Sequence, residues 1–132
     1  MDKTLVIIKP DAYREKLVGR IIAMYEENGL YIEDMYMTSL DKEGLREHYS
    51  EHVERYFYPS LITFMTEDSV VILKVSGENA VNVVREINGA TNPSKARPGT
   101  IRYLFGETIQ RNSVHGSASA SEAEKELNIW FK

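Results

Sequence analysis

The chain has 132 residues, of which 42% are hydrophobic and 27% charged, a composition typical of a globular protein with its own core. It contains no cysteine, which excludes disulfides and thiolate metal sites and favours a reducing compartment, so we expect a cytoplasmic protein. No apolar run reaches the roughly 18 to 20 residues that span a membrane. The net charge of -4 is opposite in sign to that of most nucleic-acid binders. We therefore expect neither a membrane nor a nucleic acid as a partner.

Hydrophobic periodicity predicts the elements of the N-terminal third. Residues 4–8 are apolar and mostly β-branched, which predicts a buried strand ending before Pro10. Residues 18–25 carry apolar side chains at i, i+3, i+4 and i+7 and are followed by Gly29, which predicts an amphipathic helix with a glycine stop. Residues 31–40 alternate loosely and predict a second strand.

The middle of the chain predicts smaller helices and the clearest strand. Residues 45–52 repeat the helical spacing, and residues 61–65 predict another short helix. Residues 69–75 read Ser-Val-Val-Ile-Leu-Lys-Val and predict a strand. Residues 80–87 predict a helix that a second glycine, Gly89, stops.

Periodicity disappears between residues 88 and 113, which predicts a long loop, and such loops are usually functional or disordered. A short strand around Val114 and a helix from Ser119 or Ser121 follow, since both serines begin an S-x-x-E capping box. The order predicts an α+β fold with the βαββαβ plan of a ferredoxin-like sandwich, an antiparallel sheet, extra helices and one long loop. We find no repeat or linker and expect a single domain, residues 1–132.

The long loop is basic although the chain is acidic. Four cations lie between positions 95 and 111 against one acid, Glu107: Lys95, Arg97, Arg102 and Arg111. A local anionic ligand and a solvated charged loop both explain this pattern. The chain has neither G-x-x-x-x-G-K-[ST] nor G-x-G-x-x-G, so phosphates would be held by side chains and not by a glycine cradle.

Residues 48–52, His-Tyr-Ser-Glu-His, match the H-x-x-E-H motif of inverted zinc proteases. That chemistry needs a third protein ligand and a cleft for a polypeptide, which so short a chain has little mass to build. A partly buried polar helix face, with Tyr49 and His52 directed at a phosphate, explains the same residues.

His115 is the strongest nucleophile candidate. A neutral imidazole is nucleophilic when one ring nitrogen is free and an acceptor holds the other. Gly116 removes bulk beside the ring, Ser117 offers a hydroxyl, and the following helix carries Glu122 and Glu126 on one face. A histidine that merely precedes a helix cap is the alternative, and the nearby basic loop argues against it.

The chain resembles the nucleoside diphosphate kinases almost from end to end. The motifs that carry the resemblance are TLVIIKPDA, LVGRII, EHYSEH, YFYP, GATNP, PGTIR, RNSVHGS and EAEKELNIWF, in this order. The resemblance implies a ping-pong transfer of the γ-phosphate of a nucleoside triphosphate to a nucleoside diphosphate through a phosphohistidine. It also implies Mg²⁺ carried on the nucleotide phosphates, with no metal cage in the protein, and a homo-oligomer, either a tetramer or a hexamer.

By the same resemblance, His115 is the nucleophile, Glu126 orients its ring, and Ser117 is linked to both. Lys9 and Asn112 match residues that hold the ribose, and Lys9 also faces the phosphates. The remaining implied positions divide into phosphate contacts and base contacts: Tyr49, His52, Arg85, Thr91 and Arg102 for the phosphates, and Phe57, Leu61 and Ile109 for the base. Tyr49 is counted with the catalytic group, together with Lys9.

The chain departs from the family pattern in two informative places. Ala118 stands where the family usually has an aspartate, which would cap the following helix, so we expect a modest loss of stability that other serines partly offset. Tyr103 and Leu104 follow PGTIR in place of a small residue and an aspartate, which bears on loop packing or subunit contacts. These changes leave a second hypothesis open, a non-catalytic nucleotide-binding or regulatory module on the same fold.

Overall fold

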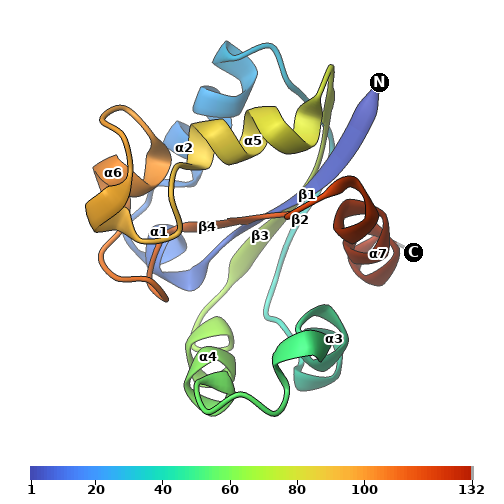
Figure 1. Cartoon of the computed structure of the whole chain (residues 1–132), viewed down its shortest axis with the longest axis vertical. Helices are drawn as coiled ribbons and strands as arrows, with labels where there is room; N and C mark the ends of the chain where they lie inside the picture. Colours follow the sequence, from blue (N-terminus) through green and yellow to red (C-terminus); the bar gives the residue numbers. More distant parts are fainter. Residues whose placement is uncertain (132) are drawn as a thin grey trace.

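The computed structural model describes residues 1–131 and contains one four-stranded antiparallel sheet in the order β2-β3-β1-β4 (Figure 1). The strands are β1 (Asp2–Ile8), β2 (Tyr31–Thr38), β3 (Val70–Gly77) and β4 (Val114–Gly116). The α-helices are α1 (Pro10–Arg14), α2 (Val18–Glu27), α3 (Lys42–His48), α4 (Tyr58–Met65), α5 (Ala80–Asn88), α6 (Ile101–Phe105) and α7 (Ala120–Trp130), and short 3₁₀ helices occupy η1 (Ser50–His52) and η2 (Pro93–Lys95). The predicted βαββαβ plan is confirmed.

Strand β1 is central because both of its faces are apolar. Val6 and Ile8 point into a core formed with α1, α2, α5 and α6. Leu5 and Ile7 point into a second core formed with α3 and α4, against which α7 packs. All four side chains are fully buried, so β1 holds together the two helical layers on either side of the sheet (Figure 1). A strand buried on both faces reads as a continuous hydrophobic run, which is the pattern of residues 4–8.

Three parts of the chain differ from the sequence prediction. The helix predicted over residues 45–52 is two elements, since α3 ends at His48 and a 3₁₀ turn follows. Helix α1 was not predicted because five residues are too few to show periodicity; Pro10 and Asp11 in its first turn favour its start. The predicted long loop contains η2 and α6, and the hydroxyl of Thr100 caps α6 by accepting a hydrogen bond from the Tyr103 backbone N–H at 3.3 Å.

The C-terminal helix begins as one of the two predicted capping boxes requires. Ser119 is the N-cap residue of α7, and its hydroxyl accepts a hydrogen bond from the backbone N–H of Glu122 at 3.2 Å. The residue before this cap is Ala118, so the helix start is capped by a serine without the carboxylate that the family usually supplies. No helix within residues 1–131 is long and apolar enough to cross a membrane.

Gly89 is required at the end of α5 for two reasons. Its φ of 86° and ψ of -179° lie in a region that only glycine adopts readily. A Cβ at this position would lie 2.5 Å from the Thr100 hydroxyl oxygen, so the turn also allows the start of α6 to approach closely.

We expect Gly89→Ala to lower the free energy of unfolding by about 3 kcal/mol, because backbone strain and a steric clash add. Gly99→Ala is the matched control: Gly99 has a φ of 91° but nothing within 4 Å of an added Cβ, so strain alone should cost about 1 kcal/mol. Urea unfolding measures both. Equal losses of unfolding free energy in the two variants would mean that Thr100 moves away from the added Cβ at position 89 without cost.

Candidate active site

The site is built around His115, the middle residue of the short edge strand β4. His115 pairs with Ile7 of β1, so the strand that carries the ring is held against the buried part of β1. Its Nε2 lies 2.8 Å from Oε1 of Glu126 on α7. A carboxylate only accepts hydrogen bonds, so Nε2 carries the hydrogen. Nδ1 makes no hydrogen bond with any residue in the range 1–131, and the ring lines a cavity.

Glu126 is held by more than the histidine. Its Oε1 also accepts a hydrogen bond of 2.7 Å from the Ser117 hydroxyl, and that hydroxyl accepts one of 3.3 Å from the backbone N–H of Leu5. Burial by itself raises the pKa of Glu126, but the hydrogen bond and electrostatic attraction of His115, together with His48 and Ser117, outweigh it and lower the pKa. The carboxylate is therefore ionised while buried.

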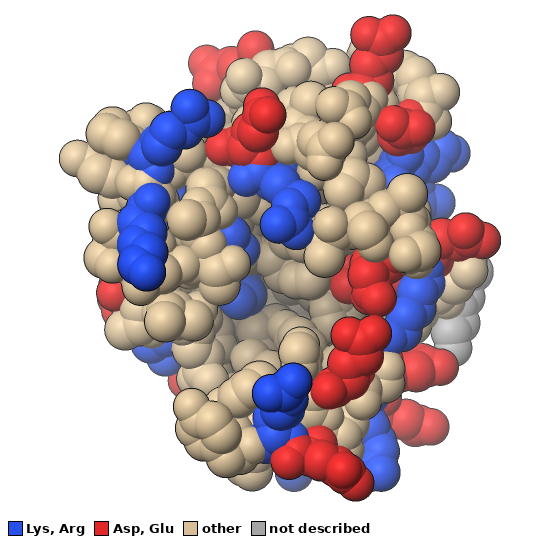
Figure 2. All heavy atoms as spheres, in the orientation of Figure 1, with Lys and Arg blue, Asp and Glu red and all other residues tan. Residues whose placement is uncertain are grey.

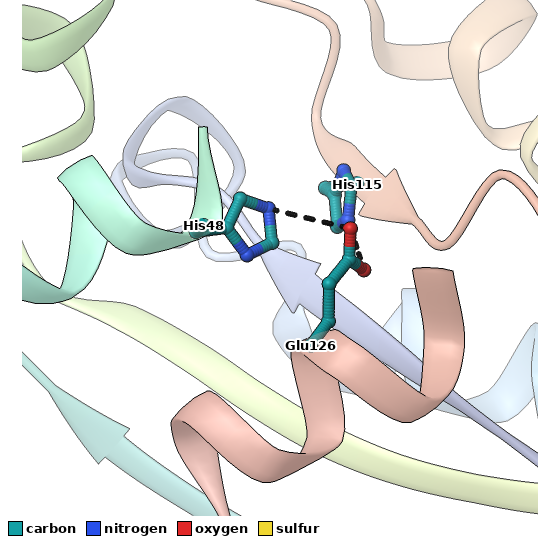
Figure 3. Close-up of side chains that lie close together, drawn as sticks. All are labelled: His48, His115 and Glu126. Carbon is teal, nitrogen blue, oxygen red and sulfur yellow. Dashed lines mark hydrogen bonds and ion pairs between the residues drawn. The ribbon is translucent and has the colours of Figure 1, made fainter. Parts of the chain in front are cut away.

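His48 completes this cluster, and the sequence did not identify it as a site residue. The ring stands on the last residue of α3, in edge-to-face contact with His115 at a centroid separation of 4.6 Å. Figure 3 shows His48, His115 and Glu126 converging from three different elements. His48 Nε2 lies 3.8 Å from Glu126 Oε2, and its Nδ1 accepts a hydrogen bond of 2.9 Å from the indole N–H of Trp130. The H-x-x-E-H motif includes His48, but it suggested a zinc ligand and not a partner of Glu126.

The cavity in front of His115 has a volume of about 1120 Å³. Figure 2 shows it as a hollow bordered on one side by Lys and Arg and on the other by Asp and Glu. Six Lys and Arg side chains from distant parts of the sequence line it: Lys9, Arg85, Lys95, Arg97, Arg102 and Lys125. Every predicted site residue lines the cavity except Ser117, which lies behind Glu126.

Lys9 and Asn112 form the floor of the cavity. The Lys9 ammonium donates a hydrogen bond of 2.8 Å to Asn112 Oδ1, and the Asn112 amide donates to the carbonyls of Thr91 and Ile109. Both side chains are buried. Burial and the nearby charge of Arg102 lower the pKa of Lys9 to about 8, although Asp11 opposes the shift.

The backbone that carries Asn112 is fixed by Asp11. The Asp11 carboxylate accepts a hydrogen bond of 3.0 Å from the backbone N–H of Ser113, a residue with a φ of 76°. The Ser113 carbonyl in turn accepts from the backbone N–H of Lys9 at 2.9 Å. The end of β1 and the start of β4 are therefore joined directly under the site.

The two arginines predicted to contact phosphates differ in how firmly their side chains are held. The Arg102 guanidinium donates to the carbonyls of Gly89 at 2.8 Å and Val114 at 2.7 Å, so it ties the turn after α5 to β4. Arg85 is exposed and makes one hydrogen bond of 3.4 Å, to the carbonyl of Ala118. Of the basic loop, Arg111 does not reach the cavity, because it pairs with Glu67 at 3.1 Å.

Aromatic and apolar side chains form the opposite wall. Phe57 lies in ring contact with His52 at 5.5 Å and with Tyr56 at 5.7 Å, and Leu61 and Ile109 line the same cavity. Tyr49 lies deeper, and burial, followed by the charge of Glu126, raises the pKa of its hydroxyl well above the ordinary value. Tyr49 therefore acts as a neutral hydroxyl.

The donors present do not suit Mg²⁺ bound by the protein itself. Within residues 1–131, the group of three metal-type ligands whose donor atoms lie within 4.8 Å of one another is His48, His115 and Glu126. Mg²⁺ prefers oxygen ligands, and this group has two imidazoles. His48 and His52 also lie on different elements, so the zinc-protease motif does not form. A cavity with this many cations suits a metal ion that arrives already bound to phosphates.

Comparison with known proteins agrees with this geometry. The family described as nucleoside diphosphate kinase matches residues 2–132. A nucleoside diphosphate kinase of Nocardioides is 49% identical over 129 residues, covering 98% of this chain and 96% of the relative. A nucleoside diphosphate kinase of Clostridium perfringens is 47% identical over 131 residues, covering 99% of this chain and 92% of the relative.

Two solved structures of nucleoside diphosphate kinases share the fold. That from Encephalitozoon cuniculi superposes with a TM-score of 0.97 at 36% identity, over 99% of this chain and 89% of the other. The structure from Aquifex aeolicus superposes with a TM-score of 0.95 at 35% identity, over 99% of this chain and 95% of the other. Sequence and fold agree over nearly the whole length of each protein. The chain therefore belongs to the nucleoside diphosphate kinase family.

Proposed function

We propose that the chain acts as a nucleoside diphosphate kinase whose nucleophile is Nδ1 of His115. In the first half-reaction, Nδ1 attacks the γ-phosphorus of a nucleoside triphosphate, a P–N bond forms, and the P–O bond to the departing diphosphate breaks. In the second, a terminal phosphate oxygen of another diphosphate attacks the same phosphorus and the P–N bond breaks. The observation that carries this proposal is the His115 ring, with Nε2 held by an ionised carboxylate and Nδ1 free at a cationic cavity.

Glu126 suits the charge that develops on the ring. When Nδ1 bonds to phosphorus while Nε2 keeps its hydrogen, the imidazole becomes cationic, and a carboxylate 2.8 Å from Nε2 stabilises that charge. Because Glu126 is fixed by Ser117 before the reaction begins, little reorganisation is needed.

Phosphoryl transfer depends mainly on positioning and on neutralising charge at the phosphate oxygens. We assign this role to Lys9, Arg85 and Arg102, with Thr91, Tyr49 and His52 as neutral or titratable donors. Arg85 is free to turn to a ligand, whereas Arg102 is held by two carbonyls and would bind a phosphate with its remaining N–H groups. Mg²⁺ would be held by the nucleotide phosphates and would neutralise part of their charge.

The nucleoside would lie against the apolar wall. Phe57 offers a face for stacking, with Leu61 and Ile109 beside it, and Lys9 and Asn112 are placed to bond ribose hydroxyls. Stacking contributes about 1 to 3 kcal/mol per base and does not distinguish bases, which favours broad specificity.

We also propose that the protein is a single-domain cytoplasmic homo-oligomer, a tetramer or hexamer. Strand β2 supports the oligomer, because it is an edge strand with exposed apolar side chains at Tyr31, Met35 and Met37. Size measurement on the native protein distinguishes the two assemblies from a monomer.

The labelling of His115 tests the proposed reaction. Incubation with γ-labelled ATP and Mg²⁺ should give an acid-labile, alkali-stable phosphoenzyme that loses its label to GDP. His115→Ala should acquire no label, because the attacking nitrogen Nδ1 is removed, yet it should still bind ATP. Calorimetry supplies that control. Wild-type protein that binds ATP without labelling would favour the alternative, a non-catalytic nucleotide-binding module.

The pKa of Lys9 predicts how nucleotide affinity depends on pH. The free protein loses the Lys9 proton near pH 8, whereas a bound phosphate favours the charged form and raises that pKa. Above pH 8, binding must therefore take up a proton, and ADP affinity should fall by up to about tenfold per pH unit. Calorimetry between pH 7.5 and about 9.5 measures this. Lys9→Met should bind more weakly and show no such fall; a flat profile for the wild type would contradict the assignment.

A further inference from the structure

We propose that His48 is a positioning residue for the phosphoryl-transfer reaction: Trp130 locks it in the tautomer with hydrogen on Nε2, and this N–H is directed at Oε2 of Glu126. The inference rests on the proposed function, since it concerns the carboxylate that holds His115. It is carried by a continuous line of side chains, from the Trp130 indole through His48 and Glu126 to Nε2 of His115.

The tautomer of His48 follows from its partner. An indole N–H can only donate, so Nδ1 of His48, 2.9 Å from Trp130 Nε1, must present a lone pair. In a neutral ring the hydrogen is then on Nε2. Burial, and secondarily the charge of His115, lower the pKa of His48 to about 3, so the ring stays neutral throughout the working pH range.

The charged and titratable groups that face the ring leave this assignment intact. They lie on four different elements or segments: Lys9, Tyr49, His115, Lys125 and Glu126. Glu126 alone favours a cationic His48, while burial and the cations oppose it. His48 therefore acts as a dipolar N–H donor and does not exchange protons with His115.

The two oxygens of Glu126 have different partners. Oε1 accepts from His115 at 2.8 Å and from Ser117 at 2.7 Å, whereas Oε2 faces only the His48 N–H among residues 1–131. At 3.8 Å this contact is longer than a hydrogen bond, and the buried Nε2 of His48 has no other partner. A buried donor without a partner is rare in a folded protein. Catalytic hydrogen bonds are often long before substrate binds and shorten in the reacting complex. We therefore assign a hydrogen bond between His48 Nε2 and Glu126 Oε2 to the reacting complex.

The same tautomer argues against a metal ion in the cluster. Coordination by His48 Nε2 would require a lone pair where the hydrogen lies, and moving the hydrogen to Nδ1 would set two N–H groups against each other at 2.9 Å. In this cluster His48 orients Glu126, and Glu126 orients His115, with each N–H donor facing one acceptor.

Trp130 is itself held in place at two points. Its carbonyl accepts a hydrogen bond of 2.6 Å from the Tyr36 hydroxyl, and its indole lies against Gly44, where an added Cβ would come within 2.8 Å of the ring. The absence of a side chain at Gly44 leaves room for the indole beside His48.

The tautomer is tested directly on wild-type protein by ¹⁵N NMR of the histidine rings between pH 6 and about 8. We expect His48 to show a protonated Nε2 and an unprotonated Nδ1 throughout. A His48 with hydrogen on Nδ1, or one that titrates in this range, would overturn the proposal whatever the activity.

Single-turnover phosphorylation of His115 by ATP tests the role. His48→Leu should slow it by about 10- to 100-fold, by analogy with the loss of a residue that orients a metal-binding histidine, with ADP affinity unchanged within about twofold. His48→Gln should retain most of the rate, because an amide can accept from Trp130 and donate to Glu126. Trp130→Phe should slow the step by about tenfold and mix the His48 tautomers.

Phe131→Leu is the matched control, since it loosens the same helix end at the Tyr36 contact without touching the bond from Trp130 to His48. It should label at the wild-type rate. Wild-type rates in His48→Leu, or equal slowing in Phe131→Leu and Trp130→Phe, would overturn the proposal while the kinase function stands. Absence of label in wild-type protein would instead remove the proposed function, and this role with it.

Discussion

The ionised carboxylate of Glu126 is the constraint on which the rest of the site depends. A buried charge is stable only where hydrogen bonds and opposite charges compensate its lost hydration, and here His115 and Ser117 do so on one oxygen. The compensation draws on three elements of the fold: α7 supplies the carboxylate, β4 the imidazole, and β1 the backbone N–H that orients Ser117. The free nitrogen of His115 is a consequence of satisfying this one group.

The sheet explains why distant segments meet at that nitrogen. Lys9 follows β1, and Asn112 precedes β4, so the antiparallel pairing of the two strands brings them to one end of the sheet. Side chains from both helical layers then line the cavity, with Arg85 of α5 and Arg102 of α6 from one layer and Phe57 and Leu61 at α4 from the other. The cavity thus has a cationic wall and an apolar wall, which suit the phosphates and the base of the proposed nucleotide.

Sequence predicted the parts of the fold that have long periodic patterns, and the site residues that lie in motifs. Residues 4–8 predicted the central strand because burial on both faces leaves an unbroken apolar run. Helix α6 and the break after His48 were missed, because each depends on a cap or a single turn that no periodicity marks. The role of His48 could not be predicted, since it is set by Trp130, 82 positions away, and only packing brings the two rings together. Arg111 belongs to the basic loop whose charge suggests an anionic ligand, but its side chain pairs with Glu67, a contact that the sequence does not reveal.

The central place of β1 has a consequence for biosynthesis. The strand is made before its partners on either side, β3 and β4: Leu5 bonds Ser117 across 112 positions, and Lys9 bonds Asn112 across 103. Until β3 and then β4 are made, the apolar residues 5–8 have no complete sheet to join and are exposed to other chains, as in other folds of high contact order. The sheet can therefore close only after Gly116 has been made, and until then the apolar residues of β1 need shielding from aggregation.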